Sequence, residues 1–169
     1  AEVEKLGNGR PTICMPDVAT ANLPAQDGDG IAVKLSRYST GQPIILLAGH
    51  IQPTKGVELF CEVLDRLRGE EICFGIIGDV DWYGFSQEFE ARLRSIAERN
   101  RNVFAHLARV HDDDINACIA ESDIIFAAYQ NFPNSSNILS KAAQFRKPII
   151  VSDGYLMAER VRKFRLGIV

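Results

Sequence analysis

Residues 44–56 read IILLAGHIQPTKG, an apolar run followed by a glycine, a short polar loop and a second glycine. The apolar residues 44–48 predict a buried strand, and Lys55 stands where a helix is expected to begin. Such a junction points backbone N–H groups and a cation at one place, which suits a phosphate or diphosphate. It is not a Walker A loop, because the order is Thr-Lys-Gly and not Gly-Lys-Thr. Junctions of this kind are common in α/β proteins, so the remaining strands must decide its role.

The bulk composition is that of an ordinary globular protein. The chain has 169 residues, of which 46% are hydrophobic and 24% charged, and its formal net charge is −3. A net negative charge does not favour a nucleic-acid backbone as partner. No apolar run reaches the roughly 18 residues of a membrane-spanning helix, and no secretory signal opens the sequence. We therefore expect no nucleic-acid partner and no transmembrane segment.

The cysteines and histidines do not suggest a metal site. No C-x-x-C pair is present, and each cysteine has apolar neighbours, which is typical of free thiols that pack in the core in a reducing compartment. His106 falls in a predicted strand, and the three aspartates at 112–114 suit a helix start. We expect a cytoplasmic protein without a metal ion. The four cysteines are Cys14, Cys61, Cys73 and Cys118.

Strand-like apolar runs alternate with helix-like segments from residue 43 onward. The alternation predicts an α/β fold, a Rossmann-like parallel sheet with helices on both faces. Ligands of such sheets bind outside the carboxyl ends of the strands. Predicted strands cover 44–48, 72–77, 103–107, 124–128, 149–151 and 166–169, and predicted helices cover 57–67, 82–96, a segment that begins with Asp112 as its N-cap, 134–145 and 157–164.

Residues 1–42 lack this alternation. We interpret them as an N-terminal connector within the same domain, with a possible short strand at Ile13-Cys14-Met15 and an ordered loop over 20–30. Residues 43–169 are then the Rossmann-like domain. The apolar ending at 167–169 would need a neighbour, so we expect the chain to be a fragment of a larger protein.

Glycines, cations and polar side chains follow the predicted strands. If the strands are parallel, these residues ring one crevice, because the carboxyl ends of parallel strands meet at one edge of the sheet. The mixture suits a nucleotide or sugar phosphate better than a hydrophobic ligand. In strand order the residues are Gly49, His50 and Lys55; Gly78, Asp79 and Asp81; Ala108, Arg109 and His111; residues 129–137; and Ser152, Asp153 and Gly154.

Five short motifs in a fixed order carry a family resemblance between residues 44 and 169. They read LLAGH (46–50), PTKG (53–56), IIGD (76–79), IAESDII (119–125) and KPIIVSD (147–153). In order and spacing they resemble a glycine–arginine turn, a Pro-Glu-Lys-Gly loop, a Val-Gly-Asp-Gly strand end, a Tyr-Ala-Ala-Ala-Asp-Val-Phe segment and a Lys-Pro-Val-Val-Ala-Ser-Asp segment. These belong to the carboxyl-terminal, donor-binding domain of GT-B-fold glycosyltransferases of the glycogen-synthase-like family four.

The resemblance implies that residues 43–169 are a nucleotide-sugar-binding domain. A nucleoside diphosphate sugar would be the donor substrate, bound in the crevice without a resident cofactor. Lys55 would hold the diphosphate, Gly49 would allow close approach, and His50 stands where the family often has arginine. The backbone around Arg109 would meet the base, and Gly78 ends the second strand. A helix start would present N–H and hydroxyl groups to a phosphate. The residues expected there are Ser135, Ser136 and Asn137.

The largest departure from the family lies at Pro133 and Lys141. The family has two glutamates eight positions apart here, one near the donor sugar and one on the ribose hydroxyls. A lysine cannot accept hydrogen bonds from ribose hydroxyls as a carboxylate does. Diphosphate binding would survive such a change, while recognition of the sugar and ribose would be altered or catalysis lost.

Three hypotheses stay open. The first is the donor-binding domain of a glycosyltransferase that moves a sugar to a hydroxyl acceptor. Its acceptor-binding amino-terminal domain is missing from this chain, so we expect the isolated chain to be inactive, and no catalytic residue is assigned. The alternative is a non-catalytic Rossmann-like module, either a degenerate transferase or a partner-binding subunit. The third is an epimerase or another nucleotide-sugar enzyme of the same fold.

Overall fold

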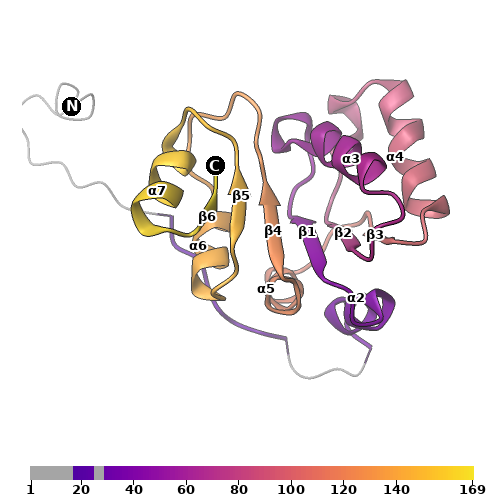
Figure 1. Cartoon of the computed structure of the whole chain (residues 1–169), viewed down its shortest axis with the longest axis horizontal. Helices are drawn as coiled ribbons and strands as arrows, with labels where there is room; N and C mark the ends of the chain where they lie inside the picture. Colours follow the sequence, from indigo (N-terminus) through magenta and orange to yellow (C-terminus); the bar gives the residue numbers. More distant parts are fainter. Residues whose placement is uncertain (1–16, 25–28) are drawn as a thin grey trace, which may run out of the picture.

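The centre of the molecule is a six-stranded sheet in the order β3-β2-β1-β4-β5-β6 (Figure 1). A computed structural model describes residues 17–24 and 29–169. All neighbouring strands are parallel, which confirms the predicted Rossmann-like sheet. The strands are β1 Ile44–Ala48, β2 Cys73–Ile77, β3 Val103–His106, β4 Ile124–Ala127, β5 Ile149–Val151 and β6 Gly167–Ile168.

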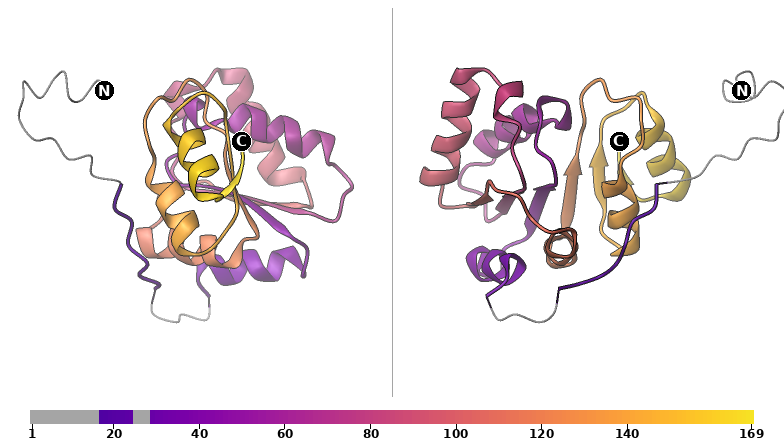
Figure 2. Two further views of the ribbon diagram at one scale, coloured as in Figure 1. Left: turned by 60° about the vertical axis from the view of Figure 1, so that its left-hand side comes forward. Right: turned by 180° about the vertical axis from the view of Figure 1, so that it is seen from behind.

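Helices cover both faces of the sheet (Figure 2). The core is accordingly split into two clusters of buried side chains. One cluster joins the sheet to α2, α5, α6 and α7, and the other joins it to α3 and α4. The helices are α2 Ile31–Ser39, α3 Val57–Arg66, α4 Gln87–Arg99, α5 Asp112–Glu121, α6 Asn137–Gln144 and α7 Leu156–Phe164, with short 3-10 turns at Pro53–Lys55 and Trp82–Gly84.

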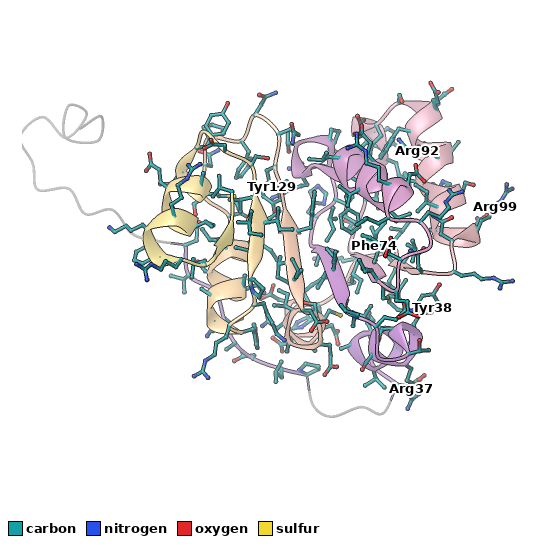
Figure 3. The ribbon with its side chains drawn as sticks, viewed as in Figure 1. Arg37, Tyr38, Phe74, Arg92, Arg99 and Tyr129 are labelled. Atoms are coloured by element: carbon teal, nitrogen blue, oxygen red, sulfur yellow. The ribbon has the colours of Figure 1, made fainter. Side chains whose placement is uncertain are left out.

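The apolar runs form strands because both of their faces are buried. All five residues of β2 are buried, and alternate residues enter different clusters, as Leu46 and Leu47 of β1 do. Phe74 of β2 anchors the α3 side, where its ring lies 5.7 Å from that of Phe60, which in turn lies 4.9 Å from Phe126 (Figure 3). The aromatic contact spans β2, α3 and β4 and ties the two halves of the sheet together.

Helix α2 was not predicted, since residues 1–42 were interpreted as a connector with at most a short strand. Ile31, Ala32 and Leu35 lie on one face of α2 and pack into the core, with Leu35 fully buried. Tyr38 adds a hydrogen bond from its hydroxyl to the Arg101 carbonyl at 3.0 Å. The helix therefore belongs to the packed domain. The possible strand at residues 13–15 lies outside the described residues.

Four helix starts differ from the prediction, and that of α7 differs only by one residue, since it begins at Leu156. The helix expected from residue 82 begins at Gln87, because a 3-10 turn comes first and the Ser86 hydroxyl accepts from the Phe89 N–H at 3.2 Å. The N-cap of α5 is His111 and not Asp112, which is the first helical residue. The helix expected from residue 134 begins at Asn137, because the backbone before it is extended.

The segment 17–24 is held against α5 and α6. Asn116, which is fully buried, donates its amide to the carbonyls of Thr20 at 3.0 Å and Asn22 at 2.8 Å. On α6, the Ser140 hydroxyl donates to the carbonyl of Asp17 at 2.9 Å. These bonds bring Thr20 beside the start of α5. Within the described ranges, no helix has the length and apolarity needed to cross a membrane.

Candidate functional site

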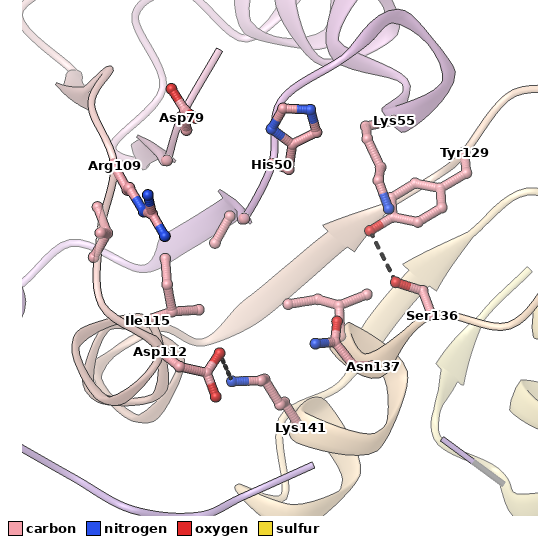
Figure 4. Close-up of a pocket in the computed structure, with 15 residues that line it drawn as sticks. His50, Lys55, Asp79, Arg109, Asp112, Ile115, Tyr129, Ser136, Asn137 and Lys141 are labelled. Carbon is pink, nitrogen blue, oxygen red and sulfur yellow. Dashed lines mark hydrogen bonds and ion pairs between the residues drawn. The ribbon is translucent and has the colours of Figure 1, made fainter. Parts of the chain in front are cut away.

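A pocket of about 460 Å³ lies outside the carboxyl ends of the central strands (Figure 4). β1 has β2 on one side and β4 on the other, so the connections leave it in opposite directions. Such a switch point leaves a crevice between the loops, which is where doubly wound sheets bind ligands. The pocket is lined by Ala48, Gly49, His50, Lys55, Gly78, Asp79, Arg109, Val110, Asp112, Ile115, Tyr129, Ser136, Asn137, Ile138 and Lys141.

The turns after β1 and β2 meet at the rim of the pocket. Gly78 has a φ of 145°, and a Cβ at that position would collide with the carbonyl of Gly49. A Cβ on Gly49 itself would meet no atom within 4 Å, and its φ of 108° is what favours glycine there. The backbones of these two turns therefore pack closely against each other, and the side of Gly49 that a side chain would occupy is open.

The turn that carries Lys55 is fixed against the end of β4. The Thr54 carbonyl accepts from the Gln130 N–H at 2.8 Å, and the Lys55 N–H donates to the Gln52 carbonyl at 2.9 Å. Gly56 follows with a φ of 72°, and a Cβ there would collide with the Ala128 carbonyl. Only glycine permits this close approach, so the position of Lys55 relative to the pocket is set by backbone contacts.

The Lys55 ammonium faces aromatic rings instead of a carboxylate. Its Nζ lies 4.0 Å from the centroid of the Tyr129 ring and 5.0 Å from that of Phe132. No ion pair to Lys55 exists within the described part of the chain. Burial lowers the pKa of Lys55 below its usual value. A half-buried cation that only π faces stabilise remains available to an anion.

The start of α6 forms the wall beside Tyr129. Ser136 is the N-cap, and its Oγ lies 3.5 Å from the Tyr129 hydroxyl. Ser136 and Asn137 line the pocket, as expected. Ser135 does not line it: its hydroxyl accepts a hydrogen bond from Arg160 of α7. Because α6 begins at Asn137, Ser135 lies in the preceding turn.

A charged cluster occupies the foot of the pocket, where α5 and α6 meet. The Lys141 Nζ donates to Asp112 Oδ1 and to Asn116 Oδ1, both at 2.6 Å. The Lys141 side chain is only 3% exposed, whereas that of Asp112 is 54% exposed. The hydrogen bond from Lys141 is the main cause of the lowered pKa of Asp112, so this carboxyl is ionised near neutral pH.

Three polar side chains line the opposite side of the pocket without a partner in residues 17–24 and 29–169. His50, Asp79 and Arg109 are exposed, and Figure 4 shows the Arg109 guanidinium turned toward the pocket interior. They leave donors and an acceptor free for a ligand. The described residues contain no group of three or more His, Cys, Asp or Glu side chains that could hold a metal ion.

Seven of the eight predicted binding residues line this one pocket, and Ser135 is the exception. Sequence reasoning missed the Asp112–Lys141 pair, because Asp112 was interpreted as a helix cap and Lys141 only as a departure from the family. A signal for both existed. Asp112 closely follows β3, and Lys141 is four residues after Asn137, which puts both side chains at the crevice.

The pocket has two chemically different ends. In Figure 4 the cation Lys55 lies beside Tyr129, and the Asp112 carboxylate lies at the foot with Lys141. A cation and helix-start N–H groups bind anionic oxygens, whereas a carboxylate accepts from hydroxyl groups. The arrangement therefore suits a ligand that carries both a phosphate and hydroxyl groups.

The sequence matches one family model. The model describes glycosyl transferases group 1 and covers residues 42–169. Comparison with curated proteins finds no significant match.

Three of the solved structures with this fold share 14–17% sequence identity with the chain. The C-terminal domain of a glycosyl transferase group 1 family protein, LpcC from Francisella tularensis, has a TM-score of 0.57 at 15% identity, covering 88% of each chain. The N-terminal domain of trehalose-6-phosphate phosphatase from Candida albicans has a TM-score of 0.60 at 17% identity, covering 82% of this chain and 33% of that one.

An α,α-trehalose 6-phosphate synthase from Burkholderia multivorans has a TM-score of 0.59 at 14% identity, covering 84% of this chain and 35% of that one. The chain thus spans about a third of the length of the last two proteins. At these identities the likeness shows the fold.

Proposed function

The chain belongs to the group 1 glycosyltransferases, and we propose that it is the donor-binding domain of an enzyme that transfers a sugar from a nucleoside diphosphate sugar to a hydroxyl acceptor. The resemblance to a GT-B carboxyl-terminal domain is confirmed by the family match and by the likeness to the LpcC domain. The donor, the acceptor and the reaction are the proposal.

One observation carries it: the half-buried Lys55 ammonium has only aromatic partners in the part of the chain that is described. Burial lowers its pKa, and a bound anion would offset that cost. A diphosphate fits this need better than a single carboxylate, because it offers several charged oxygens to Lys55 and to the free N–H groups at the start of α6.

In the proposed reaction the bond between the sugar carbon and the diphosphate oxygen breaks, and negative charge develops on the leaving diphosphate. Lys55 is fixed by its turn before the ligand arrives, so it stabilises that charge without reorganisation. Arg109, on the opposite side of the pocket, is a second cation without a partner among the described residues. In this proposal the nucleotide sugar is a substrate, with no resident cofactor. We assign no acid or base, because in a two-domain enzyme of this kind the acceptor would be bound by the other domain.

Isothermal titration calorimetry of the 169-residue chain with UDP, GDP and ADP tests the proposal. We expect at least one of them to bind, and the matching nucleoside without phosphates to bind at least 10-fold more weakly, since the contact with Lys55 is lost. The absence of binding by all three up to millimolar concentration would refute the proposal. We also expect no transferase turnover by the chain alone.

A second candidate is a non-catalytic module of the same family. The Asp112–Lys141 pair favours it, because a buried lysine already satisfied by two acceptors at the foot of the pocket contributes no free carboxylate from α6. Both candidates predict nucleotide binding. They differ in one measurement: the full-length protein with a nucleotide sugar and its acceptor releases nucleoside diphosphate only if it is an enzyme.

A further inference from the structure

The Asp112 carboxylate is held at the foot of the pocket from two sides. Lys141 donates to Oδ1 at 2.6 Å, and the Thr20 hydroxyl donates to Oδ2 at 3.2 Å. Lys141 is itself locked, because it is buried and its second bond goes to Asn116. Asn116 donates both of its amide hydrogens to backbone carbonyls of the segment 17–24. The orientation of Asp112 is therefore set by a buried, hydrogen-bonded network.

The Asp112 carboxylate can still accept hydrogen bonds from a ligand. An ionised carboxylate offers about four acceptor positions, and two of those on Asp112 are occupied. Its side chain is 54% exposed and lines the pocket. Two neighbouring hydroxyls can donate to the two oxygens of one carboxylate, and an acidic side chain that binds ribose hydroxyls is a general device of dinucleotide-binding sheets.

Lys55 at one end of the pocket and Asp112 at the other carry opposite charges, and this determines what kind of ligand can bind to both. Lys55 requires an anion, and Asp112 repels one while accepting from hydroxyls. We propose that Asp112 is the acceptor for a vicinal diol of the donor, and that Lys141 is the positioning residue that holds it. This inference rests on the proposed function, since it assigns the diol of the same nucleotide sugar whose diphosphate binds Lys55.

The test compares ligands with and without the diol. The probe is whichever of UDP, GDP and ADP binds most tightly, together with its 2′,3′-dideoxy analogue, measured by calorimetry on the 169-residue chain. We expect the wild-type chain to bind the dideoxy analogue roughly 10- to 100-fold more weakly, which is the range for hydrogen bonds to a charged group. The matching nucleoside diphosphate glucose is titrated in parallel.

Two variants separate recognition from folding. The double variant D112N/K141M removes both charges, so no buried cation is left unpaired, and its melting temperature is recorded alongside. We expect the double variant to bind the diol and dideoxy ligands within about 3-fold of each other. K141M alone keeps the carboxylate but frees it to move, and we expect it to lower the discrimination several-fold while the affinity for the dideoxy analogue stays unchanged.

The outcomes are distinguishable. If the wild-type chain binds the diol ligand more tightly than the dideoxy analogue and the double variant does not, Asp112 binds the ribose diol. If the double variant instead loses affinity only for the nucleoside diphosphate glucose, Asp112 binds a diol of the transferred sugar. Equal binding of the diol and dideoxy ligands by the wild-type chain, with no loss for the glucose derivative in the double variant, overturns the diol inference while diphosphate binding stands. Discrimination that persists in the double variant overturns it as well. If no nucleoside diphosphate binds, the proposed function and this inference both fail.

Discussion

The pocket contains two lysines whose surroundings differ in kind. Lys55 lies in a turn after β1, half-buried, with its ammonium over the rings of Tyr129 and Phe132. Lys141 lies on α6, almost wholly buried, with its ammonium bonded to a carboxylate and an amide. The same side chain is a free cation in one case and part of the framework in the other. Their partners, and not their identity, determine what each does.

The contrast shows how a binding site divides its charged groups. A cation that is already paired contributes nothing to ligand charge but fixes the position of its partner. A cation that has only π faces costs desolvation in the free protein, and that cost is recovered when an anion binds. Substitution of the first should therefore change stability, and substitution of the second should change affinity.

The largest expected effect is on folding, from Lys141→Ala. The substitution opens a cavity in a buried site and leaves Asn116 Oδ1 without its donor, so we expect the free energy of unfolding to fall by about 2–4 kcal/mol. Urea denaturation followed by circular dichroism measures it. The matched control is Lys141→Met, which loses the same donor but fills the volume, so it should cost less than the alanine variant by the contribution of the cavity. A loss below about 0.5 kcal/mol for the alanine variant would mean that the buried pair does not support the fold.

The next effect is on binding, from Lys55→Met. We expect nucleoside diphosphate affinity to fall roughly 10- to 100-fold, because a charge-assisted hydrogen bond to the diphosphate is lost. The free energy of unfolding should change by no more than about 0.5 kcal/mol, since Lys55 has no ion pair with any residue that the structure describes. Lys34→Met on α2 is the control, because Lys34 pairs with Asp29 outside the pocket. Equal losses of affinity in the two variants would contradict a specific role for Lys55.

A smaller effect is the pH dependence of that binding. Burial lowers the pKa of Lys55 from its usual 10.5, so in the free protein this lysine loses its proton at a lower pH than an exposed lysine. Because the diphosphate needs the charged form, affinity should fall several-fold as the pH rises toward 10.5 through the lowered pKa. Calorimetry in an alkaline pH series measures the fall. The Lys55→Met profile should be flat over the same range, and a parallel fall in both would assign the effect to another group.

The smallest effect is the acid dependence of stability at Asp112. The hydrogen bond from Lys141 lowers its pKa below the usual 3.8. A lowered carboxyl pKa adds stability that is fully present above 3.8 and is lost as the pH falls through the lowered pKa. Because Asp112 is half-exposed, we expect no more than about 1 kcal/mol. Urea denaturation of wild type and D112N/K141M between pH 7 and pH 2.5 measures the difference in the free energy of unfolding. This difference should be constant above pH 3.8 and change by this amount at lower pH.

The fold was predictable because its strands are buried on both faces. The bounds of β1 were predicted without error, and those of β2, β3 and β4 within one residue at either end. The reason is that a continuous apolar run between polar turns predicts a buried strand. Helix α2 was missed for the opposite reason. It is short, and its apolar face consists of Ile31, Ala32 and Leu35 among charged neighbours, so it becomes recognisable as core only once α5 and the sheet are beside it.

The site was predictable only in part, for a related reason. Parallel strands bring their carboxyl ends to one edge, so residues directly after strands, such as Gly49 and Gly78, could be gathered from the sequence. The contact between Asp112 and Lys141 joins residues that are 29 positions apart and lie on two different helices. No sequence period relates them, and the contact exists only when α5 packs beside α6. The place of Ser135 outside the pocket has a similar cause, because its hydroxyl accepts a hydrogen bond from Arg160, which is 25 positions away.

The position of β1 in the sheet has a consequence for how the chain acquires its structure. β1 pairs with β2 at short range, Ile45 with Phe74, but its other pairing joins Ile45 to Ile124, far along the chain. Long-range pairing is slow, because a large loop must close before its contacts form. We expect the β1-β2-β3 unit to assemble early during synthesis and β4 to dock later. Since the pocket is lined from both sides of that junction, nucleotide binding would show that β4 and α6 have docked.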